Sequence, residues 1–107
     1  MNVEQFYLNA AYPDISEVEI WTLPKMLAEV EPGDQDWSWR SQFAWLNQNS
    51  ADKLKALHED ISENGVQKPL LVGPDMRLWD GHHRLLVMYW RLYRYVPVEL
   101  VPKEIPV

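Results

Sequence analysis

Hydrophobic and polar residues alternate over residues 17–23, Glu-Val-Glu-Ile-Trp-Thr-Leu, as they do in a strand with one buried face. Two other short runs, residues 69–72 and 96–101, are mostly apolar and predict two more strands. The Gly-Pro-Asp sequence at 73–75 is a turn signal, so residues 77–79 are expected to begin the return strand of a hairpin.

Longer segments show the helical period instead. Apolar residues recur at helical spacing over residues 51–63, with Ser50 as the N-cap and an Asn-Gly pair as the stop signal. Residues 82–94 form a second helical segment with few polar positions, which predicts a central helix packed on a sheet. We also expect a helical turn over residues 25–30, after a proline, and a short helix with an aromatic face over residues 37–49.

The order of these elements is strand, helices, helix, strand, strand, helix, strand. This mixed order predicts an α+β domain in which helices pack against a small mixed sheet. A chain of 107 residues is long enough for one such domain, so residues 1–107 are interpreted as a single unit. Residues 1–16 lack periodicity and are expected to form an irregular arm or a short helix.

The composition limits the functions that the chain can have. Apolar residues make up 47% of it, which favours a packed core over disorder, and its net charge of −6 disfavours sequence-independent DNA binding. The absence of cysteine excludes disulfides, thiolate metal sites and cysteine nucleophiles. We see no secretion signal and no run long enough to span a membrane, so we expect a cytoplasmic protein without a membrane partner.

The turn Asp80-Gly81-His82-His83-Arg84 carries the candidate chemistry. Asp80 is expected to cap the helix that follows, and Gly81 permits a positive φ and leaves room for a ligand. Backbone N–H groups near His82 and His83 have no partner within the helix and favour an anion. The guanidinium of Arg84 suits phosphate oxygens, so the turn is a candidate phosphate site.

The same residues also have a purely structural interpretation. Asp-Gly is common between a strand and a helix, and Arg84 can pair with Asp80 without any ligand. Adjacent histidines point about 100° apart on a helix, so their spacing does not predict a metal site. The pattern alone leaves the binding and the structural interpretations equally open.

A resemblance to a known family favours the binding interpretation. The chain resembles the N-terminal domain of the ParB/sulfiredoxin superfamily over about residues 17–101, most strongly over 50–101. The motifs that carry the resemblance are a helix ending in glycine, Val-Gln-Lys-Pro at 66–69 leading into an apolar strand, Gly-x-x-Arg at 81–84 opening a helix, and Val-Pro-Val at 96–98. The resemblance implies a ParB/sulfiredoxin-like fold, of the stand-alone kind found in phages and mobile elements.

The family implies a nucleotide or phosphate at this turn, contacted by Gly81, His82, His83 and Arg84. Mg²⁺ is expected to arrive with CTP, ATP or ADP. ParB proteins have Gly-Glu-Arg-Arg at this turn, and sulfiredoxins have Gly-Cys-His-Arg. Gly81 and Arg84 match the first and last residues of both motifs. His82 stands in place of the catalytic cysteine, which excludes sulfiredoxin chemistry.

Four residues have more specific expected roles. Gln67 and Lys68 stand where family members place a polar pair beside the nucleotide, so both are candidate binding residues. His83 is a candidate catalytic residue that orients a phosphate oxygen or donates to it. Asp80 is the second candidate catalytic residue, as a possible Mg²⁺ ligand.

Three functional hypotheses follow. The first is a nucleotide-binding domain that acts as an NTP hydrolase or a small-molecule kinase. The second is a non-catalytic protein-interaction module or homodimer that uses an aromatic face formed by Trp37, Trp39 and Trp45. The third is a ParB-like nuclease, which the acidic charge disfavours. Chromosome-partitioning ParB proteins add a helix-turn-helix domain that we do not find here, so we do not expect sequence-specific DNA binding.

Overall fold

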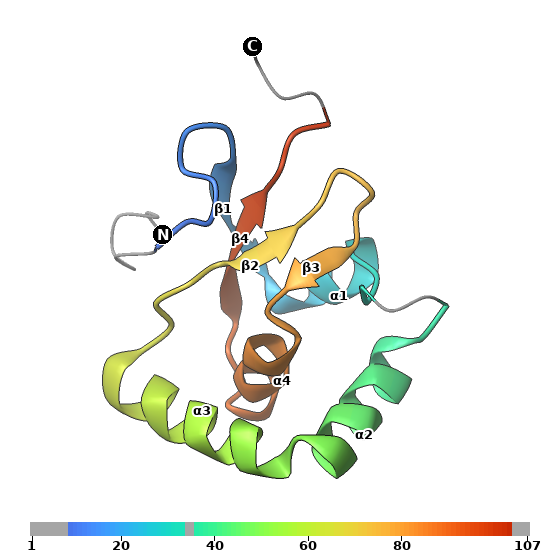
Figure 1. The fold of residues 1–107 in the computed structure, drawn as a ribbon, viewed down its shortest axis with the longest axis vertical. Coiled ribbons are helices and arrows are strands. Elements are labelled where there is room, and N and C mark those ends of the chain that lie inside the picture. Colours follow the sequence, from blue (N-terminus) through green and yellow to red (C-terminus); the bar gives the residue numbers. More distant parts are fainter. Residues whose placement is uncertain (1–8, 34–35, 104–107) are drawn as a thin grey trace.

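The computed structural model describes residues 9–33 and 36–103 and forms a four-stranded sheet with four helices (Figure 1). The expected α+β class with a small mixed sheet is therefore confirmed. No helix in these two ranges is long and apolar enough to cross a membrane. In chain order the elements are β1 (Glu17–Thr22), α1 (Leu23–Glu29), α2 (Trp39–Asn49), α3 (Ala51–Asn64), β2 (Leu70–Val72), β3 (Leu78–Asp80), α4 (His82–Trp90) and β4 (Tyr95–Leu100).

The sheet has the strand order β1-β4-β2-β3, so the last strand in the chain lies between the first two. β4 pairs antiparallel with β1 and parallel with β2, whereas β2 and β3 form the expected antiparallel hairpin. Parallel strands cannot be joined by a tight turn. The chain between β2 and β4 therefore crosses over, and this crossover consists of β3 and α4.

The core lies between one face of the sheet and the helices. Val96 and Val98 alternate along β4 and point to this face, where Leu70 and Val72 of β2 join them. α4 lies between the sheet and α3 (Figure 1) and buries four consecutive residues, as expected for a central helix. The apolar stripe of α3 completes the layer, with Leu54 and Ile61 buried and Leu57 partly buried.

A buried carboxylate anchors the N-terminal arm to the sheet. Glu99 of β4 is only 1% exposed and points to the side of the sheet opposite the helices. It accepts hydrogen bonds from the backbone N–H groups of Ala11 (2.7 Å) and Tyr12 (2.8 Å) and from the Ser16 hydroxyl (2.5 Å). Residues 9–16 form bends and turns, as the irregular-arm interpretation expected, and residues 1–8 lie outside the described residues.

Three local expectations need correction. Ser50 stands at the start of α3, but its side chain makes no cap hydrogen bond, because the same residue also ends α2. α4 ends at Trp90 instead of residue 94, because the chain turns at Leu92, where φ is +58°. Trp39 does not join an exposed aromatic face, since it packs on the core and donates its indole N–H to the carbonyl of Val30 (2.8 Å).

Replacing Glu99 tests the anchor. We expect Glu99→Gln to lower the free energy of unfolding by about 2 kcal/mol, because a neutral amide accepts the three hydrogen bonds less strongly and brings donors of its own. Urea denaturation followed by tryptophan fluorescence measures the change. Glu17→Gln, an exposed glutamate on β1, is the control and should stay within about 0.5 kcal/mol of the parent protein.

Candidate functional site

The turn from β3 into α4 requires glycine at position 81. Gly81 has φ +114° and is the N-cap residue of α4. A Cβ atom there would lie 2.8 Å from Leu70 Cδ2 and 3.0 Å from Arg84 Nη2. The positive φ agrees with the sequence interpretation. The absent side chain does not leave room for a ligand as expected, because Leu70 and Arg84 pack into that space.

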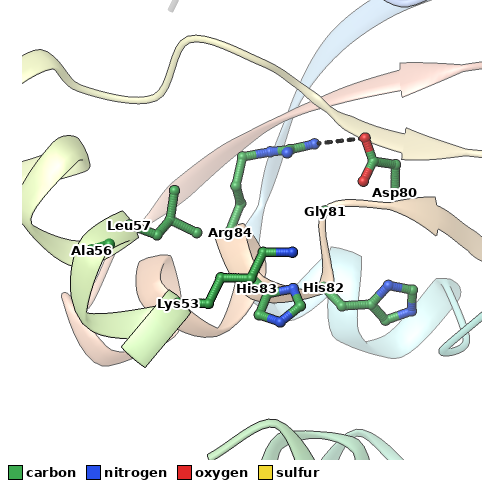
Figure 2. A pocket seen from close by; sticks show the side chains of 8 residues that line it. All are labelled: Lys53, Ala56, Leu57, Asp80, Gly81, His82, His83 and Arg84. Carbon is green, nitrogen blue, oxygen red and sulfur yellow. Dashed lines mark ion pairs between the residues drawn. The ribbon is translucent and has the colours of Figure 1, made fainter. Parts of the chain in front are cut away.

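Asp80 does not cap α4, contrary to expectation. The helix has no side-chain cap hydrogen bond, since its N-cap residue is a glycine. The Asp80 carboxylate instead lies 3.6 Å from Nη2 of Arg84, and its side chain is 67% exposed (Figure 2). Within the described residues, no side-chain cap hydrogen bond therefore closes the start of α4.

A cavity of about 400 Å³ opens in front of this turn. Residues 80–84 line one side, and Lys53, Ala56 and Leu57 of α3 line the other (Figure 2). Sequence reasoning missed Lys53. The spacing of three and four residues to Ala56 and Leu57 was the available signal, because it places all three on one helix face next to the buried stripe.

Contacts within the fold occupy part of the Arg84 guanidinium. Its Nη2 donates to the Pro69 carbonyl at 3.1 Å and also faces Asp80, and its side chain is 16% exposed. The pairing with Asp80 that the structural interpretation anticipated is therefore present. Within the described residues, however, the buried Nε of Arg84 has no hydrogen-bond partner, so the guanidinium retains unused donor capacity.

His83 points toward Lys53 at the cavity (Figure 2). Its buried Nε2 has no hydrogen-bond partner in the part of the chain that the structure describes. Burial lowers the pKa of His83 below its ordinary value of 6.5, and the positive charges of Lys53, His82 and Arg84 lower it further, against the opposing effect of Asp80. These effects favour the neutral form of the imidazole.

The His82 ring turns away from His83 (Figure 2). Its Nε2 accepts a hydrogen bond from the backbone N–H of Gly33 (3.0 Å), and the ring lies against Trp39 with the centroids 6.2 Å apart. His82 lines the cavity, but this ring nitrogen serves to hold the connection between α1 and α2 against α4.

The structure does not bring Gln67 and Lys68 to the cavity. Both are exposed, and neither lines it. The Gln67 carbonyl accepts a hydrogen bond from the N–H of Asn9 (2.8 Å), so this segment contacts the N-terminal arm. The next residue, Pro69, is buried, and its carbonyl accepts a hydrogen bond from Arg84 at the site.

Comparison with solved structures shows which known fold the chain shares. The chain is similar to a Pnob8-like ParB-N domain, with a TM-score of 0.57 and 16% sequence identity over 83% of the chain. The fold is that of a ParB-N domain. The match covers 31% of the solved ParB-N chain, and no protein-family model or curated protein sequence matches. A ParB-N fold agrees with the resemblance based on the motifs at 66–69, 81–84 and 96–98.

The lowered pKa of His83 predicts a pH dependence of stability. As the pH falls below about 6.5, the unfolded chain takes up this proton more readily than the folded chain, so the free energy of unfolding decreases until the pH passes the folded pKa. We expect His83→Gln to lose less stability than the parent between about pH 7 and about pH 5. Thermal unfolding across this range measures it, with His58→Gln as the control for loss of an imidazole. An unchanged pH profile in His83→Gln would contradict the assignment.

Proposed function

We propose that this ParB-like domain binds a phosphate-bearing small molecule, a nucleotide such as CTP, ATP or ADP, at the cavity in front of Gly81. The observation that carries this proposal is the convergence of Lys53, His83 and Arg84 on the uncapped N-terminus of α4. A folded chain normally satisfies its buried polar groups. Here Nε2 of His83 and Nε of Arg84 lack partners among the described residues.

The chemistry of the lining matches a phosphate group. The first-turn N–H groups of α4 supply donors and the positive end of the helix dipole. Lys53 adds a flexible ammonium group from the facing helix, and Arg84 adds a planar cation. In a chain with a net charge of −6, this grouping of cations is a local exception, which favours an anionic ligand.

Asp80 is the residue that suits a nucleotide-borne Mg²⁺. It is the only carboxylate among the described residues that line the cavity. Mg²⁺ that enters with a nucleotide commonly takes one or two protein carboxylates together with phosphate oxygens and water, and there it neutralises phosphate charge. Binding there would compete with the 3.6 Å contact between Asp80 and Arg84, leaving Arg84 freer to reach the phosphate.

Two phosphoryl-transfer reactions, nucleotide hydrolysis and small-molecule phosphorylation, are compatible with this arrangement. A neutral imidazole can accept a proton from an attacking water or hydroxyl group, and the lowered pKa of His83 favours that form. We therefore propose His83 and Asp80 as the catalytic residues if the bound nucleotide is turned over.

Isothermal titration with CTP, ATP and ADP, each with Mg²⁺, tests the proposal. We expect at least one nucleotide to bind, and Lys53→Ala to weaken it by about tenfold or more, because a charge-assisted hydrogen bond contributes about 1.5–3 kcal/mol. Lys55→Ala is the matched control, since it removes the same charge from an exposed position on α3 outside this cavity.

Two results would contradict the proposal: no binding of any of the three nucleotides, or equal losses in Lys53→Ala and Lys55→Ala. Assaying released phosphate in the same mixtures separates turnover from binding. Activity that survives in His83→Gln would remove His83 from the catalytic role and leave the binding site intact.

A further inference from the structure

The turn that ends α4 contains a strained leucine. The Leu92 N–H bonds the Tyr89 carbonyl (3.1 Å) and the Tyr93 N–H bonds the Met88 carbonyl (3.0 Å), which is the Schellman pattern of a helix end. This pattern places Leu92 in the left-handed region, with φ +58°. Glycine is the usual residue at this position, because an L side chain is strained there. Helix termination therefore does not explain why the residue is a leucine.

Packing does not explain it either. The Leu92 side chain is 86% exposed, so it contributes almost nothing to the core. Three aromatic neighbours in sequence are also large and exposed: Tyr89 (47%), Trp90 (44%) and Tyr95 (38%). Clustered exposed apolar side chains of this kind are typical of interaction sites.

Leu92 lies at the edge of a groove of about 620 Å³. Arg94 is the only charged residue among the described residues that line the groove, and within the described chain its side chain makes no ion pair or hydrogen bond. The groove is therefore apolar with an available cation at its wall. Its lining residues are Thr22, Leu23, Pro24, Tyr89, Leu92, Tyr93, Arg94 and Tyr95.

We propose that this groove binds an extended segment of a protein partner in which a large apolar side chain is flanked by Asp or Glu. The apolar side chain would contact Leu92 and the tyrosines, and the carboxylate would pair with Arg94. Charge complementarity favours this occupant over a second copy of the chain. In a two-fold interface with Arg94 near the axis, the Arg94 side chains of the two copies would repel each other.

This surface is separate from the nucleotide cavity. The cavity lies at the N-terminus of α4, whereas the groove lies at its C-terminus, and no residue lines both. Failure of one proposal therefore leaves the other standing.

Selection from a random dodecapeptide library displayed on phage tests the groove, with Leu92→Gly as the comparison variant. We expect enriched peptides that combine a large apolar residue with Asp or Glu, and at least tenfold weaker binding to Leu92→Gly as measured by fluorescence anisotropy. The melting temperature of Leu92→Gly should equal or exceed that of the parent, since glycine relieves the backbone strain.

Met76→Gly is the matched control. Met76 also has a left-handed backbone (φ +59°) and an exposed apolar side chain (39%), but it lies in the β2–β3 hairpin. The Met76→Gly variant should bind the selected peptides with the affinity of the parent protein. The Arg94→Glu variant should lose affinity for the peptides that contain Asp or Glu. No enrichment, equal binding to Leu92→Gly, or a dimer in light scattering that Leu92→Gly dissociates would overturn the proposal.

Discussion

The parallel pairing of β2 with β4 is the constraint on which the rest of the structure depends. In this register Leu70 lies opposite Val98 and Leu71 opposite Glu99. Because parallel neighbours need a crossover, the chain leaves the sheet after the edge strand β3 and crosses one face of it as α4 before it returns as β4. The crossover packs α4 against the sheet and places its start at Gly81, beside the beginning of β2. α3 lies alongside α4 (Figure 1), and its residue Lys53 lines the same cavity as Gly81 (Figure 2).

The Glu99 carboxylate and the N-terminus of α4 differ in whether the rest of the chain satisfies their hydrogen bonds. The buried carboxylate of Glu99 is satisfied by three donors from the N-terminal arm, and so it serves the fold. The N-terminus of α4 has the reverse composition, with donors and cations but no capping acceptor. Asp80 faces Arg84 from an exposed position, where an ion pair is weakened by solvent. An anionic ligand would accept hydrogen bonds from the start of α4, as the Glu99 carboxylate accepts them from the N-terminal arm.

Much of the fold could be predicted from local sequence patterns. The alternation in β1, the helical spacing in α3 and the turn signal between β2 and β3 each depend on neighbouring residues, and each led to the correct element. The strand order could not be derived in this way, because pairing between β1 and β4 joins distant segments. The early end of α4 was also missed, since Leu92 occupies a left-handed position where the usual glycine signal is absent.

The candidate site was predictable only in part for the same reason. Residues 80–84 are contiguous, so their motif was visible, and the conformation of Gly81 followed from its type. Lys53 comes from another helix and enters the site only through tertiary packing. Asp80 fits the local rule for a helix cap, but the N-cap residue of α4 is Gly81, and the Asp80 carboxylate faces Arg84.

The most direct test of the proposed phosphate site is to observe its backbone amides while inorganic pyrophosphate is added. A titration followed by ¹H–¹⁵N correlation spectra should produce saturable shifts that are largest for the N–H groups of His82, His83 and Arg84, because these begin α4 at the cavity. Shifts that are absent, or that are confined to the exposed Lys55 and Arg91 surface, would contradict the proposed site.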